Sequence, residues 1–174
     1  DPTEGALIYM AEAFGVDHEE LEDKYPRLFE QPFDSERKRM TTVHMIDGRL
    51  TAYTKGAVDE MLPLCSSMLT SCGVRPMTEA DRKNVARLCL EMSENALRVL
   101  GFAFRELGAV PEDDDEDVES DLTFIGAAGM IDPPRREVAE SVRTCRAAGI
   151  RTIMITGDHK VTAAAIAKEL DIYR

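Results

Sequence analysis

A lysine and a glycine stand together at Lys55 and Gly56, after a β-prone run and before an expected helix start. The lysine places a positive charge at the end of a strand, and the glycine lets a ligand come close to the backbone. The free amides at the start of a helix favour an anion. The pair therefore predicts an anion contact, and the alternative is a strand-to-helix turn with a solvated lysine.

An aromatic ring and a cation precede that β-prone run. Phe33 stands five residues before Lys38 in F-D-S-E-R-K-R-M. The ring could stack on a base while the lysine brings charge to phosphates. The alternative is a core phenylalanine followed by a solvated charged run.

Two further charged residues stand near the ends of expected elements. Glu4 completes a capping-box spacing with Asp1, and its carboxylate has acceptor sites left for an adenine amino group. Arg98 opens a β-prone run after an amphipathic segment, where the alternative is a surface arginine.

A hydroxyl, a glycine and a carboxylate follow the apolar run 150–155 as Thr156, Gly157 and Asp158. Ligands of open α/β sheets bind at the carboxyl ends of strands, and these groups suit phosphate and Mg²⁺. The alternative is an ordinary strand-to-helix loop with Asp158 near the helix N-terminus.

The elements that must position these residues are clearest around Asp47-Gly48. A D-G pair between β-prone runs is a strong hairpin signal, and it predicts strands at 40–46 and 49–54. Further strands are expected at 98–105 and 122–131, and helices at 1–14, at 57–68 and from 78 to about 92. Residues 112–121 contain eight acidic side chains in ten and predict a solvated loop.

The pattern changes at Asp132-Pro133-Pro134-Arg135. A helix at 136–148, a strand at 150–155 and a helix at 161–170 follow, an order typical of parallel α/β sheets. One strand is too few for a complete parallel sheet. The sequence predicts an α+β domain at 1–131, an antiparallel sheet flanked by helices, and an incomplete α/β domain at 132–174.

Composition restricts the partners. The net charge of -12 disfavours nucleic acid and anionic membrane surfaces. No apolar run approaches the roughly 20 residues of a membrane span. The four cysteines and three histidines show no metal-ligand spacing, so no metal site is expected and the thiols are expected to be reduced.

Six segments in this order resemble the central cytosolic region of type II P-type cation-transporting ATPases, with the bacterial calcium-pump-like branch as the nearest match. They are D-P-T-E-G-A-L, F-D-S-E-R-K-R-M, Y-T-K-G-A, R-V-L-G-F-A, M-I-D-P-P-R and M-I-T-G-D-H-K. The resemblance implies a nucleotide-binding domain at 1–131 and the start of a haloacid dehalogenase-like phosphorylation domain at 132–174.

By the same resemblance, Phe33 stacks on adenine and Glu4 contacts its amino edge. Lys38, Lys55 and Gly56 line the ATP pocket, and Arg98 and Leu100 lie beside the ribose or phosphates. Thr156, Gly157 and Asp158 meet the γ-phosphate. Animal calcium pumps carry an arginine where Ser35 stands here, and Arg37 could replace that charge.

The resemblance also implies a membrane-embedded parent with this segment in the cytosol, which moves a cation, most simply Ca²⁺, by phosphorylating an aspartate from ATP and Mg²⁺. Its partners would be the remaining phosphorylation, actuator and transmembrane domains. The chain contains neither D-K-T-G-T nor G-D-G-x-N-D. It therefore offers no catalytic residue, and we expect ATP binding without turnover.

Two other functions are consistent with these residues. A free-standing nucleotide-binding or regulatory module would explain the binding motifs. A small phosphatase would explain T-G-D, but it needs an aspartate after an early strand and none is suitable. The apolar strand expected at 150–155 lacks parallel neighbours, so we expect residues 132–174 to be disordered or ordered by a non-native dimer contact.

Overall fold

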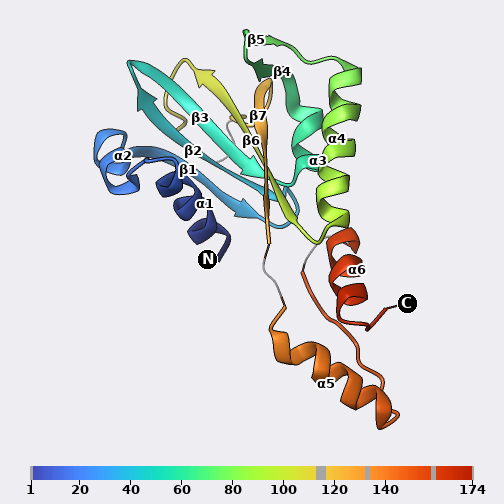
Figure 1. The fold of residues 1–174 in the computed structure, drawn as a ribbon. Coiled ribbons are helices and arrows are strands. Elements are labelled where there is room, and N and C mark those ends of the chain that lie inside the picture. The colour runs from blue at the N-terminus through green and yellow to red at the C-terminus, as the bar shows by residue number, and fades with distance from the viewer. Residues whose placement is uncertain (1, 113–116, 132–133, 158–159, 174) are drawn as a thin grey trace. The chain divides into compact units, whose positions relative to one another are not determined.

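The computed structural model describes residues 2–112, 117–131, 134–157 and 160–173 (Figure 1). The chain divides into two compact units. The first contains Asp1–Lys83 and Leu100–Ala128, and the second contains Asn84–Val99 and Gly129–Arg174.

A seven-stranded sheet in the order β1-β2-β3-β6-β7-β4-β5 is the main feature of the fold. Its strands are β1 (Arg27–Asp34), β2 (Arg39–Ile46), β3 (Arg49–Gly56), β4 (Cys65–Thr70), β5 (Gly73–Pro76), β6 (Arg98–Leu107) and β7 (Leu122–Met130). The helices are α1 (Pro2–Ala13), α2 (His18–Lys24), α3 (Val58–Met61), α4 (Glu79–Glu94), α5 (Arg136–Ala147) and α6 (Lys160–Glu169). Figure 1 shows α1 and α2 next to β1 and β2. The expected sheet flanked by helices is confirmed, with one difference: β4 pairs with β7 in parallel.

The hairpin of β2 and β3 is confirmed. Asp47 and Gly48 both have positive φ, 49° and 79°. Positive φ at both central residues is the requirement of a type I′ turn, which matches the twist of the two strands. Pairing runs without a shift from Ile46 opposite Arg49 to Arg39 opposite Gly56. This hairpin carries Val43, Leu50 and Ala52 of the core, against which Phe29 and Leu107 pack.

The helix expected at 57–68 is much shorter than predicted. α3 ends at Met61, a 3-10 turn spans Leu62–Leu64, and Cys65 begins β4. Pro63 has no amide to continue the helical ladder, which gives the physical reason for the stop. The apolar residues of the expected helix are buried all the same: Val58, Met61, Leu62 and Cys65.

Besides β4, three elements were not expected from the sequence, namely α2, β1 and β5. Asp17 caps α2 by accepting hydrogen bonds from the amides of Glu19 and Glu20. β1 lies at the edge of the sheet and contains Pro32, and its pairing with β2 shifts between Gln31 and Asp34. A proline has no amide to donate, so an edge strand with irregular pairing tolerates it.

The start of α4 and the strands β6 and β7 are close to expectation. The amide of Thr78 donates to the Asp81 carboxylate at 2.9 Å, and the amide of Asp81 donates to the Thr78 hydroxyl at 3.2 Å. This reciprocal pair is a capping box.

The acidic segment is not wholly solvated, which corrects one expectation. Val118 and Glu119 are buried, at 2% and 6% exposure. Residues 113–116 lie outside the described part of the chain. Arginine partners explain the burial of Glu119 and are described below.

The second unit has the expected helices but not the expected strand. α5 ends at Ala147 and is followed by Gly149, whose φ is 75°, and α6 begins at Lys160. Residues 150–155 pair with no strand among the described residues, so the prediction of a strand there is wrong. A strand needs a ladder partner, and the described chain offers none to this segment. No described helix is long and apolar enough to cross a membrane.

Candidate functional site

One face of the sheet presents a mixed polar and aromatic surface. Met40 of β2 lies opposite Lys55 of β3, which lies opposite Phe102 of β6. Paired residues of adjacent strands share a face, so these three side chains form a row across the sheet. Thr42, Tyr53 and Phe104 form the next row on the same face.

A cavity of about 360 Å³ lies over these rows and lies entirely within the first unit. Its volume falls within the range of small-molecule sites. The lining residues are Glu4, Arg27, Met40, Thr42, Tyr53, Thr54, Lys55, Phe102, Ala103 and Ile125. Two of the predicted site residues, Glu4 and Lys55, are therefore brought together although 51 positions separate them.

Glu4 and Lys55 form an ion pair at the wall of this cavity. Lys55 Nζ donates to Glu4 Oε2 at 2.6 Å, and the lysine is the more shielded partner. The lysine comes from a central strand and the carboxylate from the first turn of α1. The cavity lining thus contains two cationic side chains, Lys55 and Arg27, and one anionic side chain, Glu4, so it can accept an anion and a hydrogen-bond donor side by side.

The β1–β2 connection carries the predicted ring and the second lysine. Phe33, 63% exposed, stands near the end of β1, where its face is open to a ligand. Lys38 ends the connection with φ 53°, and its Nζ donates to Glu60 Oε1 at 2.8 Å. That hydrogen bond and charge raise the pKa of Lys38 and lower the pKa of Glu60.

Asp34 holds this connection in shape. Its Oδ1 accepts from the amides of Glu36 at 2.8 Å and Arg37 at 2.9 Å, and its carbonyl accepts from the amide of Lys38 at 2.6 Å. The two side-chain bonds lower the pKa of the Asp34 carboxyl. This Asx-type turn fixes the backbone between Phe33 and Lys38.

Steric overlap explains why position 56 is a glycine. A Cβ on this residue would lie 2.4 Å from Arg39 Cβ and 2.6 Å from the carbonyl oxygen of Lys38. The residue type is therefore required by the close approach of β2, whereas the sequence suggested the approach of a ligand.

The Arg37 side chain is engaged by Glu119 and by the backbone of β1. Its Nη1 contacts both carboxylate oxygens of Glu119 at 2.7 Å, and its Nη2 donates to the carbonyl of Pro32. Arg37 would therefore have to break or share these bonds in order to take the place of a phosphate-binding arginine at position 35.

Of the predicted residues only Glu4 and Lys55 line this cavity, so Phe33, Lys38 and Gly56 lie outside its lining, as do the remaining predicted residues. Leu100 is half-buried in the first unit, and Arg98 is exposed at the start of β6 in the second. Thr156 and Gly157 are exposed in the second unit, and Asp158 lies outside the described residues.

Sequence reasoning missed eight of the lining residues, among them Met40, Thr42, Tyr53 and Phe102. The signal for the first three was present. Register counted back from the Asp47-Gly48 turn places Met40 opposite Lys55 and Thr42 opposite Tyr53. Phe102 follows only once β6 is known to pair with β3.

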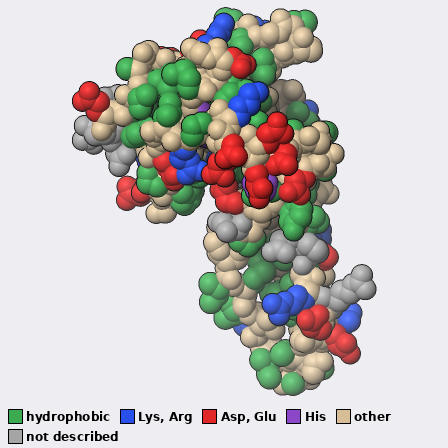
Figure 2. Space-filling model, turned by 90° about the vertical axis from the view of Figure 1, so that its left-hand side faces the viewer, with side chains coloured by type: hydrophobic (Ala, Val, Ile, Leu, Met, Phe, Trp, Pro, Cys, Tyr) green, Lys and Arg blue, Asp and Glu red, His purple; other side chains and the backbone are tan. Residues whose placement is uncertain are grey.

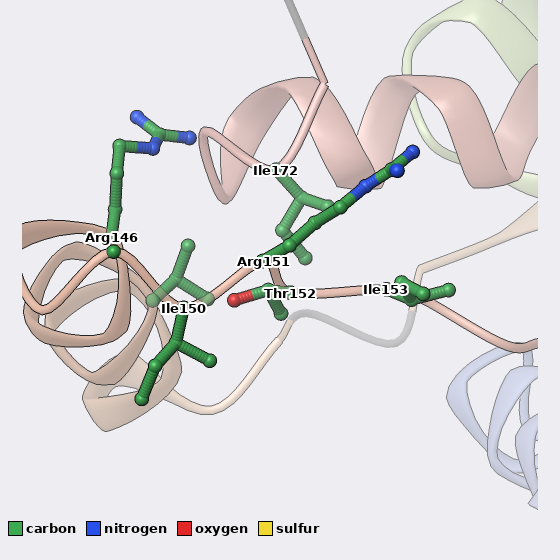
Figure 3. Close-up of a pocket in the computed structure, with 8 residues that line it drawn as sticks. Arg146, Ile150, Arg151, Thr152, Ile153 and Ile172 are labelled. Carbon is green, nitrogen blue, oxygen red and sulfur yellow. The ribbon is translucent and has the colours of Figure 1, made fainter.

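A second cavity, of about 480 Å³, lies in the second unit and contains none of the predicted residues. Figure 3 shows Ile150, Ile153 and Ile172 around it, with Arg146 and Arg151 at its edge. Its lining is mainly residues 149–153, the segment that was expected to be a strand.

Charge around the first unit is mostly negative. Figure 2 shows acidic side chains gathered on the face that carries α2, whose sequence is HEELEDK. Such a surface repels an anion at long range, so a phosphate must be held by local cations. Within the described residues no cluster of histidine, cysteine or carboxylate groups could hold a metal ion.

Comparison with known proteins identifies the family. The profile described as P-type ATPase, cytoplasmic domain N, matches residues 1–137. A calcium-transporting ATPase 1 of Bacillus cereus is 49% identical over 172 residues, covering 99% of this chain and 19% of the relative. A cation-transporting ATPase of Synechocystis is 43% identical over 99% of the chain and 19% of its own length. A calcium-transporting ATPase of Bacillus subtilis is 42% identical over 98% and 19%.

The chain thus spans about a fifth of the length of these relatives. The resemblance drawn from the six sequence segments is confirmed. The chain belongs to the P-type ATPase family and corresponds to the cytoplasmic region of its calcium- and cation-transporting members that contains domain N.

Proposed function

We propose that this chain captures ATP for a cation-transporting P-type ATPase. The observation that carries the proposal is the cavity over β2, β3 and β6, where α1 supplies Glu4 and β3 supplies Lys55. Family membership supports it, since the matched profile is that of the ATPase cytoplasmic domain N.

The residues suit the parts of a nucleotide. The exposed ring of Phe33 is available to stack on adenine, and Glu4 can accept a hydrogen bond from the adenine amino group. Lys55 and Lys38 supply positive charge to the phosphates. Gly56 lets the end of β3 pack closely against Lys38 and Arg39, next to these two lysines.

Both lysines already hold carboxylates, at 2.6 Å for Lys55 and 2.8 Å for Lys38. A phosphate therefore has to share or displace Glu4 and Glu60. Such competition lowers affinity, which agrees with an expectation of weak binding, since a millimolar Kd is only about -4 kcal/mol.

The parent enzyme would transfer the γ-phosphoryl group of ATP to an aspartate, hydrolyse that intermediate and move a cation, with Ca²⁺ as the proposed ion, across the cell membrane. Mg²⁺ would neutralise phosphate charge in that reaction. Thr156, Gly157 and Asp158 are proposed to meet the γ-phosphate, and Arg98 and Leu100 to lie near the ribose or phosphates. Because this chain lacks D-K-T-G-T, we propose that it binds ATP without hydrolysing it.

The proposed partners of the chain are the remaining phosphorylation, actuator and transmembrane domains of the same pump. A second copy of the chain is a further proposed partner, through residues 132–174. Supporting this contact, Ile153 and Ile155 are 71% and 93% exposed beside the second cavity.

The direct test is a titration of ATP and Mg-ATP followed by amide chemical shifts, with Phe33→Ala and Lys55→Ala alongside. We expect shifts at Glu4, Phe33 and Lys55, and at least about tenfold weaker binding in each variant, because one loses the stacking ring and the other a phosphate charge.

Phe14→Ala and Lys24→Ala are the matched controls. Phe14 is 82% exposed, and neither Phe14 nor Lys24 of α2 is a proposed nucleotide contact. Both controls should bind like the unaltered chain. A well-dispersed spectrum that does not respond to saturating nucleotide would contradict the proposed function, and so would ATP hydrolysis that Asp158→Ala abolishes.

A further inference from the structure

Glu119 is a buried carboxylate that the proposed binding residues do not use. It follows the acidic segment and is 6% exposed. A carboxylate at that depth is costly unless charged partners and hydrogen bonds surround it.

Three side chains of the β1–β2 region surround Glu119. Arg37 Nη1 lies 2.7 Å from both carboxylate oxygens, and Arg39 Nε donates to Oε2 at 2.6 Å. The hydroxyl of Thr41 donates to Oε1 at 2.8 Å. Thr41 also shares a 2.9 Å hydrogen bond with the hydroxyl of Thr54 on β3.

The side chains around Glu119 lie on the face of the sheet opposite to Met40 and Lys55, although Thr54 also contributes to the cavity lining. Thr41 and Thr54 are cross-strand partners, as are their neighbours Met40 and Lys55. Side chains of successive strand residues point to opposite faces. Glu119 therefore acts from behind the strands that carry Lys55.

Its two arginines extend to the backbone beside the proposed binding residues. Arg37 Nη2 donates to the carbonyl of Pro32 at 2.8 Å, one residue before Phe33. Arg39 Nη1 donates to the carbonyl of Arg37 at 3.0 Å, one residue before Lys38. One carboxylate thus orients two guanidinium groups, and each of them holds a peptide next to a proposed nucleotide contact.

We propose that Glu119 is a positioning residue for nucleotide binding, which fixes Phe33 and Lys38 through Arg37 and Arg39. The inference rests on the proposed function. It explains why a carboxylate from a segment about 80 residues further along the chain is buried behind the β1–β2 connection.

The test compares Glu119→Gln, Arg37→Gln and the double variant in titrations with ATP and with adenosine. Glutamine keeps the shape of the side chain but cannot pair with two cations. We expect Kd to rise about tenfold for both ligands in Glu119→Gln, because the ring is displaced before any phosphate is involved. Lys55→Ala should weaken the binding of ATP and leave the binding of adenosine nearly unchanged.

The test also measures whether the effects of Glu119→Gln and Arg37→Gln on Kd are coupled. A purely structural role of Glu119 would not produce this coupling. If Glu119 acts through Arg37, the double variant binds no more weakly than Glu119→Gln alone. The amide of Lys38, bonded to the Asp34 carbonyl, should also exchange its hydrogen faster in Glu119→Gln. Glu106→Gln is the control, since it removes an exposed ion pair with Arg49 on the same sheet.

Arg37 is less buried than Glu119, so Arg37→Gln keeps the test available if Glu119→Gln unfolds. Unchanged affinity for both ligands in folded variants, with normal binding by the unaltered chain, overturns the positioning role alone. Independent, additive losses overturn it as well. An unaltered chain that binds neither ligand overturns the proposed function, and with it this role.

Discussion

At the residue scale, the glycine at position 56 has two possible explanations, close packing against the neighbouring strand and close approach of a ligand. The structure shows the first of them. Gly56 lacks a Cβ, which makes room for the backbone of Lys38 and Arg39, and its φ is not in the left-handed region. Any ligand contact at Gly56 is additional to this packing. A substitution there would push β2 and β3 apart beside the proposed cavity.

Gly56→Ala should lower the free energy of unfolding by about 1–3 kcal/mol, because the added methyl group overlaps backbone atoms that cannot rotate away. The measurement is urea unfolding. Gly126→Ala is the matched control on β7, where a Cβ would meet no atom within 4 Å. That variant should be neutral or slightly more stable. Equal stability in the two variants would contradict the steric explanation.

The sequence could identify single residues of the site better than their partners. Lys55, Glu4 and Phe33 could be selected by motif and by position at element ends. Glu60 and Glu119 could not, because their ion pairs with the β1–β2 connection depend on how distant segments fold together. The acidic segment 112–121 was expected to be solvated, and nothing in its sequence indicated that Glu119 would be buried.

At the element scale, the sequence predicted secondary structure correctly where one short motif determines the backbone conformation. Asp47-Gly48 predicted the hairpin because positive φ at two residues leaves few other structures. Cys65–Thr70 was misread because its apolar spacing also fits a helix, and only pairing with β5 and β7 makes it a strand. The same ambiguity explains residues 150–155, whose β-prone sequence has no partner among the described residues.

The capping box of α4 makes a prediction about pH. Asp81 accepts two bonds from Arg75 at 2.7 Å and one from the Thr78 hydroxyl at 2.6 Å. These bonds hold the pKa of Asp81 far below its ordinary 3.8. A lowered folded-state pKa stabilises the protein above the unfolded value, and that stabilisation is lost as the pH falls below it.

Asp81→Asn should therefore lower the urea midpoint at neutral pH and reduce its fall below about pH 4. Glu79→Gln is the control, since it removes a carboxylate from the same first turn of α4. A midpoint that falls with pH as steeply in Asp81→Asn as in the unaltered chain would show that other carboxyl groups control acid stability.

At the scale of the whole molecule, the second unit exposes three isoleucines within one short segment, residues 150–155. The first unit buries a core between strands and short helices, with Val43, Ala52 and Met61 fully enclosed. In the second, Ile150, Ile153 and Ile155 are all more than half exposed. Exposed apolar side chains at this density are typical of an interaction surface.

We expect this surface to make the chain self-associate. Replacing Ile153 and Ile155 by Asp should raise the dimer dissociation constant at least about tenfold in sedimentation equilibrium, because charge replaces apolar contact. The control replaces Tyr9 and Phe14 by Asp, two exposed apolar residues of the first unit. A chain that remains monomeric at every concentration, or equal weakening in both double variants, would contradict the contact.

The parallel pairing of β4 with β7 has a consequence for synthesis on the ribosome. The β4–β5 hairpin emerges early, but its inner neighbour in the sheet begins only at Leu122. Until then Cys65 lacks its strand partner Leu122, and non-local pairing of this kind is slow. The nascent chain must therefore hold an unfinished sheet edge while residues 77–121 are translated, which is the interval in which a chaperone would be most useful.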